Sequence, residues 1–262
     1  MRRGDIFWGG ILIILGALFL LQANGRLSDV FGWFWPLFFI LLGAWILATR
    51  YLPGLASDSG EKFSIDLQGA TQLALDFDHG AGSVQIGGGA PAGVAVAGSQ
   101  ASGMDVKSHL SGDRLEVKID AGPTFIPFIG PESGTWHFQL SQEVPITLDV
   151  DAGASHLELD LTDLKVTHVS VDTGASTLQV KLPARAGNTL VDIESGAATL
   201  DLSVPQGVAA RVRVRQGASS IDIDKSRFPM RDTGLYQSAD YDTAANKVEI
   251  NLDGGANTVK VG

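Results

Sequence analysis

Two kinds of hydrophobic pattern divide the chain: two long apolar runs at its start, then short runs in which apolar and polar residues alternate. The apolar runs, residues 6–25 and 30–49, contain no charged side chain. About 20 residues of α-helix cross the hydrocarbon layer of a bilayer, and in lipid the backbone must satisfy its hydrogen bonds within the segment. The pattern therefore predicts a transmembrane hairpin of two helices over residues 1–50, with its turn at 26–29.

The basic residues that flank this hairpin predict its orientation. Arg2 and Arg3 precede the first span, and Arg50 follows the second. Because basic flanks stay on the inner side, both ends of the hairpin and all that follows it are expected in the cytoplasm. A cleaved signal peptide is the competing interpretation of the first run. However, no small-x-small cleavage site follows that run, and a second full-length apolar run comes at once.

A repeated Gly-Ala motif organises the rest of the chain, after a linker at residues 51–62. Its central glycines are Gly80, Gly153, Gly174, Gly196, Gly217 and Gly255. From Gly153 to Gly217 they recur with a regular period of about 21 residues, which is typical of solenoids. Apolar residues alternate with polar ones around each glycine, which directs them to one face. The sequence therefore predicts an all-β fold, a right-handed parallel β-solenoid over residues 63–262, with insertions near 121–135 and 225–246.

The repeat also predicts how adjacent coils meet. Each motif glycine is expected at a corner between strands, where it would adopt a positive φ angle. Charged residues one repeat apart would be neighbours on adjacent coils, about 4.8 Å from each other. The pairs expected from this rule are Asp160 with Lys181, Asp192 with Arg213, and Glu194 with Arg215.

Charge and composition narrow the function. The chain has a net charge of −10 and no cysteine, so disulfides and thiolate chemistry are excluded, and nucleic acid is not expected as a partner. The five histidines show no metal-ligand spacing. Carboxylate pairs such as Asp149 and Asp151 are possible Ca²⁺ ligands, but acidic strand faces that keep a sheet soluble are the favoured interpretation. Because no motif places a nucleophile beside a base, the sequence predicts no enzyme, no catalytic residue, no cofactor and no metal.

One segment lacks the acidic residues and the alternation of apolar and polar residues that are typical of the rest of the chain after the linker. Residues 123–131 are apolar, uncharged and interrupted by three prolines, which excludes a regular central strand. The segment either caps one end of the solenoid or presents an apolar surface to a partner. On the second interpretation, the candidate partner contacts are Phe125, Ile126, Phe128 and Ile129.

Three stretches of sequence carry a resemblance to a known family. Residues 3–16, which include Trp8-Gly-Gly-Ile-Leu-Ile-Ile-Leu-Gly16, and residues 34–43 resemble the two-span membrane region of LiaI- and LiaF-type bacterial proteins. Residues 136–183, with two Gly-Ala-Ser corners, are similar to the toast-rack domain of that family. The resemblance covers most of the chain. It implies a multi-pass protein of the bacterial cytoplasmic membrane that regulates the cell-envelope stress response by acting on a two-component histidine kinase.

A structural role is the alternative to regulation. A membrane-tethered β-solenoid could stack end to end as a filament or serve as an adhesin-like scaffold. The expected partners are therefore the lipid bilayer and a membrane or signalling protein, and self-association is left open. Capped ends of the solenoid would favour the regulator, and bare apolar ends would favour the scaffold.

Overall fold

The structure is a computed structural model that describes residues 35, 38–39, 61–100, 104–121, 135–217 and 219–262. The chain forms two compact units, Met1–Ser59 and Gly60–Gly262. In the first unit Trp35 is helical, and its ring stacks on the ring of Phe39 with centroids 5.8 Å apart. No helix within the described ranges is long and apolar enough to cross a membrane. Apart from Trp35, Phe38 and Phe39, both expected spans lie outside those ranges.

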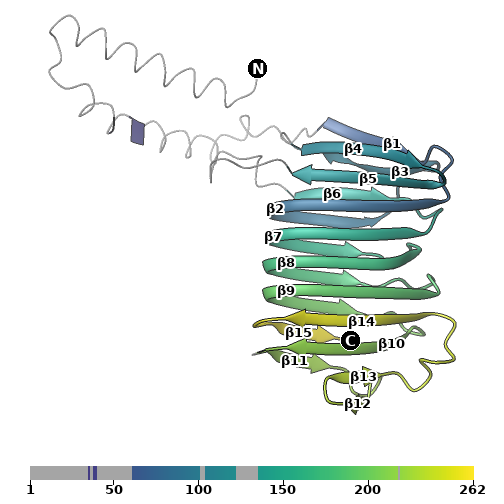
Figure 1. Ribbon diagram of the computed structural model, residues 1–262, viewed down its shortest axis with the longest axis vertical. Helices are drawn as coiled ribbons and strands as arrows, with labels where there is room; N and C mark the ends of the chain where they lie inside the picture. Colours follow the sequence, from purple (N-terminus) through teal and green to yellow (C-terminus); the bar gives the residue numbers. More distant parts are fainter. Residues whose placement is uncertain (1–34, 36–37, 40–60, 101–103, 122–134, 218) are drawn as a thin grey trace, which may run out of the picture. The chain divides into compact units, whose positions relative to one another are not determined.

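The second unit is built from β-strands in one mixed, largely parallel sheet (Figure 1), which confirms the all-β prediction. In chain order the strands are β1 (Glu61–Asp66), β2 (Gln72–Gly88), β3 (Val94–Gln100), β4 (Met104–Ser111), β5 (Arg114–Ala121), β6 (Thr135–Leu140), β7 (Ile146–Asp160), β8 (Val166–Lys181), β9 (Asn188–Ser203), β10 (Ala209–Gln216), β11 (Ser220–Ile223), β12 (Met230–Asp232), β13 (Leu235–Gln237), β14 (Lys247–Gly254) and β15 (Thr258–Val261).

The four long strands β2, β7, β8 and β9 fold over at their motif glycines. The first half of each lies in the front layer of Figure 1, and the second half lies behind it. We call one pass of the chain through both layers a rung. Neighbouring rungs pair in parallel along both halves, and Val150 lies opposite Val171 while Leu157 lies opposite Leu178. These four side chains are buried between the layers, because alternation along a strand turns every second residue inward.

The order of the rungs departs from the order of the chain after β9. β14 lies between β9 and β10, with Ile250 opposite Val191 on one side and Val212 on the other. The prediction that Asp192 and Arg213 are neighbours is therefore wrong, because Asn251 lies between them. Asn251 donates a hydrogen bond to Asp192 at 2.8 Å.

Glu194 and Arg215 are separated in the same way, by Asp253. The long connection between β11 and β14 makes this order possible, because it lets the last residues of the chain return to a rung position further up the stack. Where rungs do follow the chain, the expectation holds: Lys181 Nζ lies 2.8 Å from Asp160 Oδ2, which confirms that pair.

The motif glycines stack in a row, but none of them has a positive φ, so that part of the prediction is wrong. The row runs in the order Gly80, Gly153, Gly174, Gly196, Gly255 and Gly217. Neighbouring glycines of the row face each other through a backbone carbonyl oxygen. A Cβ atom on Gly153 would lie 2.5 Å from the Gly80 oxygen, and one on Gly255 would lie 2.6 Å from the Gly196 oxygen. Close approach of two backbones, rather than a left-handed conformation, therefore requires glycine here.

The residues between β2 and β7 build one end of the sheet. β7 lies directly beside β2, with Leu148 opposite Leu75. On the other side of β2, its first half pairs with β5 and its second half with β6. β4 then extends the front layer beyond β5, while β3 and β1 extend the back layer beyond β6. The candidate contacts Phe125, Ile126, Phe128 and Ile129 lie outside the described residues and remain a prediction.

Candidate functional site

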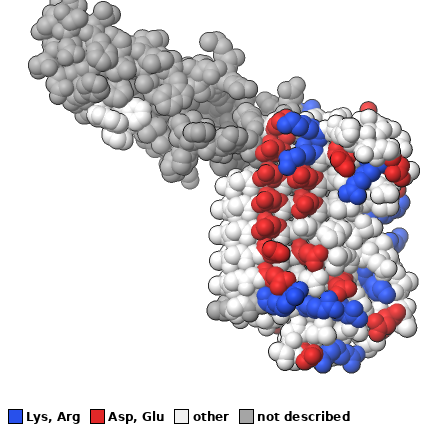
Figure 2. Space-filling view, in the orientation of Figure 1, with Lys and Arg blue, Asp and Glu red and all other residues white. Residues whose placement is uncertain are grey.

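A column of carboxylates crosses the outer side of the front layer. Seven acidic residues lie opposite one another on seven consecutive strands, and Figure 2 shows acidic residues aligned across that layer. We call this set the acidic column: Asp105, Asp120, Asp78, Asp151, Asp172, Glu194 and Asp253. Paired strands are about 4.8 Å apart, so most members face a like charge on both sides.

Basic residues are present at the two ends of the acidic column. Arg215 follows Asp253 on the next strand, with Nε and Oδ1 3.2 Å apart, and Lys107 Nζ lies 2.6 Å from Asp105 Oδ2. The four central members, from Asp78 to Glu194, form no ion pair with another described residue. The middle of the acidic column is therefore a band of excess negative charge, in which Asp78 also attracts the nearby Lys118.

Burial and repulsion raise the pKa of Asp151 above its ordinary value. Partial burial is the largest cause, and the carboxylates of Asp78 and Asp172 on the adjacent strands come next. Like charges at this spacing disfavour the ionised form. A cationic group brought against the column would relieve this repulsion and would be attracted to the column from a distance.

The acidic column does not form a metal cage. Within the ranges that the structure describes, no three His, Asp or Glu side chains come together as metal ligands. The carboxylates of the column stand in a line along a flat layer, whereas Ca²⁺ requires about six to eight oxygen atoms around one point. The acidic column is therefore an open charged surface rather than an enclosed site.

His79 is a buried titratable group that directly precedes the motif glycine Gly80. Its side chain is 4% exposed, and its ring centroid lies 4.6 Å from that of Trp136. Neither ring nitrogen has a hydrogen-bond partner among the described residues. Burial lowers the pKa of His79, and the charge of Asp78 acts in the opposite direction. Strand alternation could have revealed this position, because His79 has the same parity as the buried Phe77.

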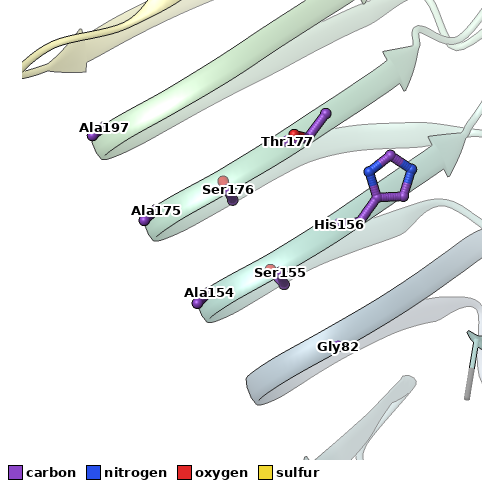
Figure 3. Close-up of a pocket in the computed structure, with 8 residues that line it drawn as sticks. All are labelled: Gly82, Ala154, Ser155, His156, Ala175, Ser176, Thr177 and Ala197. Atoms are coloured by element: carbon purple, nitrogen blue, oxygen red, sulfur yellow. The ribbon is translucent and has the colours of Figure 1, made fainter. Parts of the chain in front are cut away.

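A shallow, open hollow lies along the corners of β2, β7, β8 and β9 (Figure 3). It is lined mainly by small side chains: Gly82, Ala154, Ser155, His156, Ala175, Ser176, Thr177 and Ala197. The buried hydroxyl groups of Ser155 and Ser176 lack a described hydrogen-bond partner, and Figure 3 shows them behind the ribbon of their strands. The hollow therefore lacks the enclosing walls and converging polar groups of a small-molecule site.

The second unit is thus a stack of folded-over β-strands with a row of glycines at its corners and a column of carboxylates on its outer side. Comparison with known families identifies the family to which this chain belongs. The chain belongs to the toast-rack family, because the N-terminal domain of toast-rack (DUF2154) matches residues 55–203. The LiaF transmembrane domain matches residues 7–78, so the chain is a LiaF-type membrane protein with a toast-rack domain. Neither family is a known enzyme family.

A solved structure shares the fold at low sequence identity, and no curated protein matches the chain. A candidate cell adhesion protein from Clostridium sporogenes ATCC 15579 has a TM-score of 0.67 and 18% identity, covering 77% of this chain and 98% of that one. At this identity the likeness shows the fold alone. A candidate adhesin from Bacteroides fragilis NCTC 9343 covers 78% of this chain and 98% of its own, at 10% identity and a TM-score of 0.30, which is too low to carry an argument.

Proposed function

We propose that this chain is a non-enzymatic regulator held at the bacterial cytoplasmic membrane. It acts in the cell-envelope stress response by protein–protein contact, and its partner is a two-component histidine kinase. The observation that carries this proposal is the joining of a LiaF transmembrane domain to a toast-rack domain in one chain. A membrane anchor confines the domain to the layer where a membrane kinase lies, which raises the effective concentration of one for the other.

The proposal includes a specific organisation of the chain. Residues 1–50 form the two-span hairpin, residues 51–62 form the linker, and residues 63–262 form a β-solenoid in which each rung is one coil. Arg2, Arg3 and Arg50 support a cytoplasmic position for the solenoid. A cytoplasmic domain of net negative charge would be repelled by anionic lipid headgroups, which leaves its surface free for a protein.

The acidic column is the surface that we propose for the partner. Its central carboxylates have no ion pair among the described residues, and they are held in register by paired strands on both sides. A partner with basic residues on a matching face would gain Coulomb energy and relieve the repulsion within the column. Such complementarity raises association rates and selects the partner.

Site-specific photocrosslinking of the full-length protein in its native membrane tests this contact. A photoreactive amino acid at Asp172 lies in the centre of the acidic column, and the same group at Gln179 lies on the outer side of the other layer of the same strand. We expect a crosslink to a histidine kinase from position 172 and none from position 179. Crosslinks from both positions alike, or to no kinase, would contradict the proposal.

A charge-matched pair of variants separates a specific contact from a general effect of net charge. Asp151→Asn with Asp172→Asn removes two carboxylates from the column, whereas Asp163→Asn with Asp240→Asn removes two exposed carboxylates elsewhere. We expect the first pair to release the kinase from regulation, measured as its autophosphorylation rate in the same membranes, and the second pair to leave that rate unchanged.

The cysteine-free chain makes the cytoplasmic position directly measurable. Asp163→Cys introduces a single, exposed thiol. We expect a membrane-impermeant maleimide to label it in broken cells and not in intact ones. Labelling in intact cells would place the domain outside and would contradict a cytoplasmic kinase contact.

An adhesion or scaffold function is the second candidate. It is favoured by the fold shared with the Clostridium sporogenes protein, which is a candidate cell adhesion protein. The maleimide experiment distinguishes the two functions, because an adhesin must be labelled in intact cells. A scaffold would also form large polymers when the full-length protein in nanodiscs is examined by light scattering.

A further inference from the structure

The two layers of the sheet end differently below the rung formed by β10 and β11. In the front layer, β10 is followed by β13 and β12. In the back layer, β11 pairs with β15 on one side and with no described strand on the other. This end of the second unit, which we call the stepped end, therefore extends two strands further in one layer than in the other.

Unpaired backbone groups lie on both parts of the step. On β11, the backbone N–H groups of Ser220 and Asp224 point toward β15. They donate hydrogen bonds to the carbonyl oxygens of Asn257 and Val261, each at 2.9 Å. Because backbone groups alternate in direction along a strand, those of Ile221 point away from β15 to the free edge. β12 is also an edge strand, since it pairs only with β13 among the described strands. Edges of this kind are templates for pairing with another strand.

Two core positions are left uncovered at the same edges. Ile221 continues an inward row in which Leu200 and Val259 are at most 1% exposed, yet Ile221 itself is 42% exposed. Met230 lies opposite the buried Tyr236 and so has inward parity, yet it is 53% exposed. Among the other large apolar side chains at inward positions of the described strands, only Leu110, on the end strand β4 opposite the buried Leu115, is comparably exposed, at 37%. The exposure of Ile221 and Met230 on both edges indicates a surface that another chain covers.

Charged residues without an ion pair lie on both edge strands. Asp222 lies on the outer side of β11, and Arg231 lies on β12 next to Met230. Neither of them has an ion pair among the described residues. Met230 and Asp232 pair with consecutive residues of β13, so Arg231 is the extra residue of a β-bulge, and Asp232 follows it on the same edge. Arg231 is therefore the basic residue of β12 that Asp222 of another copy would meet.

A two-fold rotation brings these complementary edges together. The axis runs along the strands and exchanges the layers, so the longer front layer of one copy meets the shorter back layer of the other. β12 runs in the direction of β10, because two antiparallel pairings separate them, and β11 runs the opposite way after the corner (Figure 1). The rotation therefore places β12 of one copy antiparallel to β11 of the other, at both steps simultaneously.

End-to-end stacking in one direction does not close the step. At the opposite end of the unit, among the described strands, the back layer extends only one strand beyond the front layer, because β1 follows β3 while β4 is the last strand of the front layer. A second copy placed that way would bring β4 against β12 and leave a gap one strand wide beside β11. Only the two-fold arrangement matches a step of two strands with an identical step.

We propose that the stepped end is a self-complementary interface through which two copies of this chain form a two-fold dimer. β11 of each copy pairs with β12 of the other, Ile221 and Met230 become covered, and Asp222 lies near Arg231 of the other copy. Both layers then continue as unbroken sheets from one copy into the next. This interface is separate from the acidic column, so it goes beyond the proposed function, and the two proposals are tested independently of each other.

Disulfide crosslinking between two chains tests the geometry in the membrane. The chain has no cysteine, so Asp222→Cys in one tagged copy and Arg231→Cys in a second, differently tagged copy are each unique. We expect a crosslinked heterodimer from this pair under mild oxidation. The control pair, Asp163→Cys with Arg231→Cys, should give at least tenfold less. Equal yields from both pairs would overturn the proposal.

Charge reversal tests the same interface without a crosslink. We expect Asp222→Arg to weaken the dimer of the full-length protein in nanodiscs at least tenfold, as measured by light scattering over a range of concentrations. Adding Arg231→Asp to the same chain should restore it, and this rescue excludes simple misfolding of the single variant. A wild-type protein that stays monomeric, polymers larger than a dimer, or a dimer insensitive to Asp222→Arg would each overturn the proposal.

Discussion

From β2 to β9 each rung lies beside the rung that precedes it in the chain, but below β9 it does not. There the last long strand, β14, lies between β9 and β10. Both regions bury the same alternation of apolar residues, and both contribute to one row of glycines. The comparison teaches that alternation decides which side chains point inward, whereas the connections between rungs decide which rungs become neighbours.

The largest expected effect comes from crosslinking across the inserted rung. Asp192→Cys with Asn251→Cys joins adjacent strands, where Cα atoms about 5 Å apart allow a disulfide. Asp192→Cys with Arg213→Cys spans two strand spacings, about 10 Å. We expect nearly complete oxidation of the first pair and almost none of the second, read from mobility on a non-reducing gel. The opposite result would show that rungs follow the chain throughout.

The next effect compares glycines from the two regions. Gly255→Ala should destabilise the protein by about 2 kcal/mol or more, because its Cβ would lie 2.6 Å from a backbone oxygen that cannot move freely. Gly80→Ala should cost less than about 1 kcal/mol, because its Cβ meets no described atom within 4 Å. Urea denaturation measures both. Equal losses of stability in the two variants would mean that close approach of neighbouring backbones is not the reason for glycine at these positions.

A smaller effect is expected from the buried histidine at the β2 end. Between the ordinary pKa of 6.5 and its lowered value, the unfolded chain binds a proton that folded His79 does not, so stability should fall as the pH falls below 6.5. His79→Leu should remove this dependence and be neutral or stabilising by up to about 1 kcal/mol at pH 7, since no hydrogen bond is lost. Melting curves at pH 7 and 5.5 test this, and an unchanged pH dependence in the variant would refute it.

The smallest effects are expected on the outer side of the sheet, and they have opposite signs. Lys181→Ala should lower the stability only slightly, because its ion pair with Asp160 is exposed to solvent. That pair lowers the pKa of Asp160, so its contribution is present above pH 3.8 and is lost as the pH falls further. Asp151→Asn should instead stabilise by about 0.2–0.5 kcal/mol at pH 7, with the gain shrinking in high salt. Denaturation in low and high salt checks both signs.

Sequence alone was sufficient for features that depend on neighbouring residues. Alternation predicts that Leu157 points inward and His156 outward, and in the structure Leu157 is buried and His156 is exposed. The regular repeat correctly predicted the contact of Asp160 with Lys181, because a short turn forces consecutive rungs together. The same rule failed for Asp192 and Arg213, because the chain makes a long excursion between β11 and β14, through β12 and β13, before it returns.

Other features depended on the way in which distant segments meet. The motif predicted glycine at each corner but assigned it a positive φ, because the stacked carbonyl oxygen that excludes a side chain belongs to another rung. The acidic column shows the same dependence, since its members are scattered through the sequence and no two of them are close neighbours along the chain. Only strand pairing brings Asp78 beside Asp151, although β3, β4, β5 and β6 separate them along the chain.

The sequence by itself therefore determined the all-β class, the inward positions, the location of the corners and the membrane character of the N-terminal segment. These follow from local chemistry, because Cβ atoms alternate along a strand and a long apolar run needs lipid or a core around it. The tertiary structure alone decided the order of the rungs, the line of carboxylates and the stepped end. Each of these depends on which strand edges are still unpaired after β14 has inserted between β9 and β10. That pairing is a property of the whole path of the backbone.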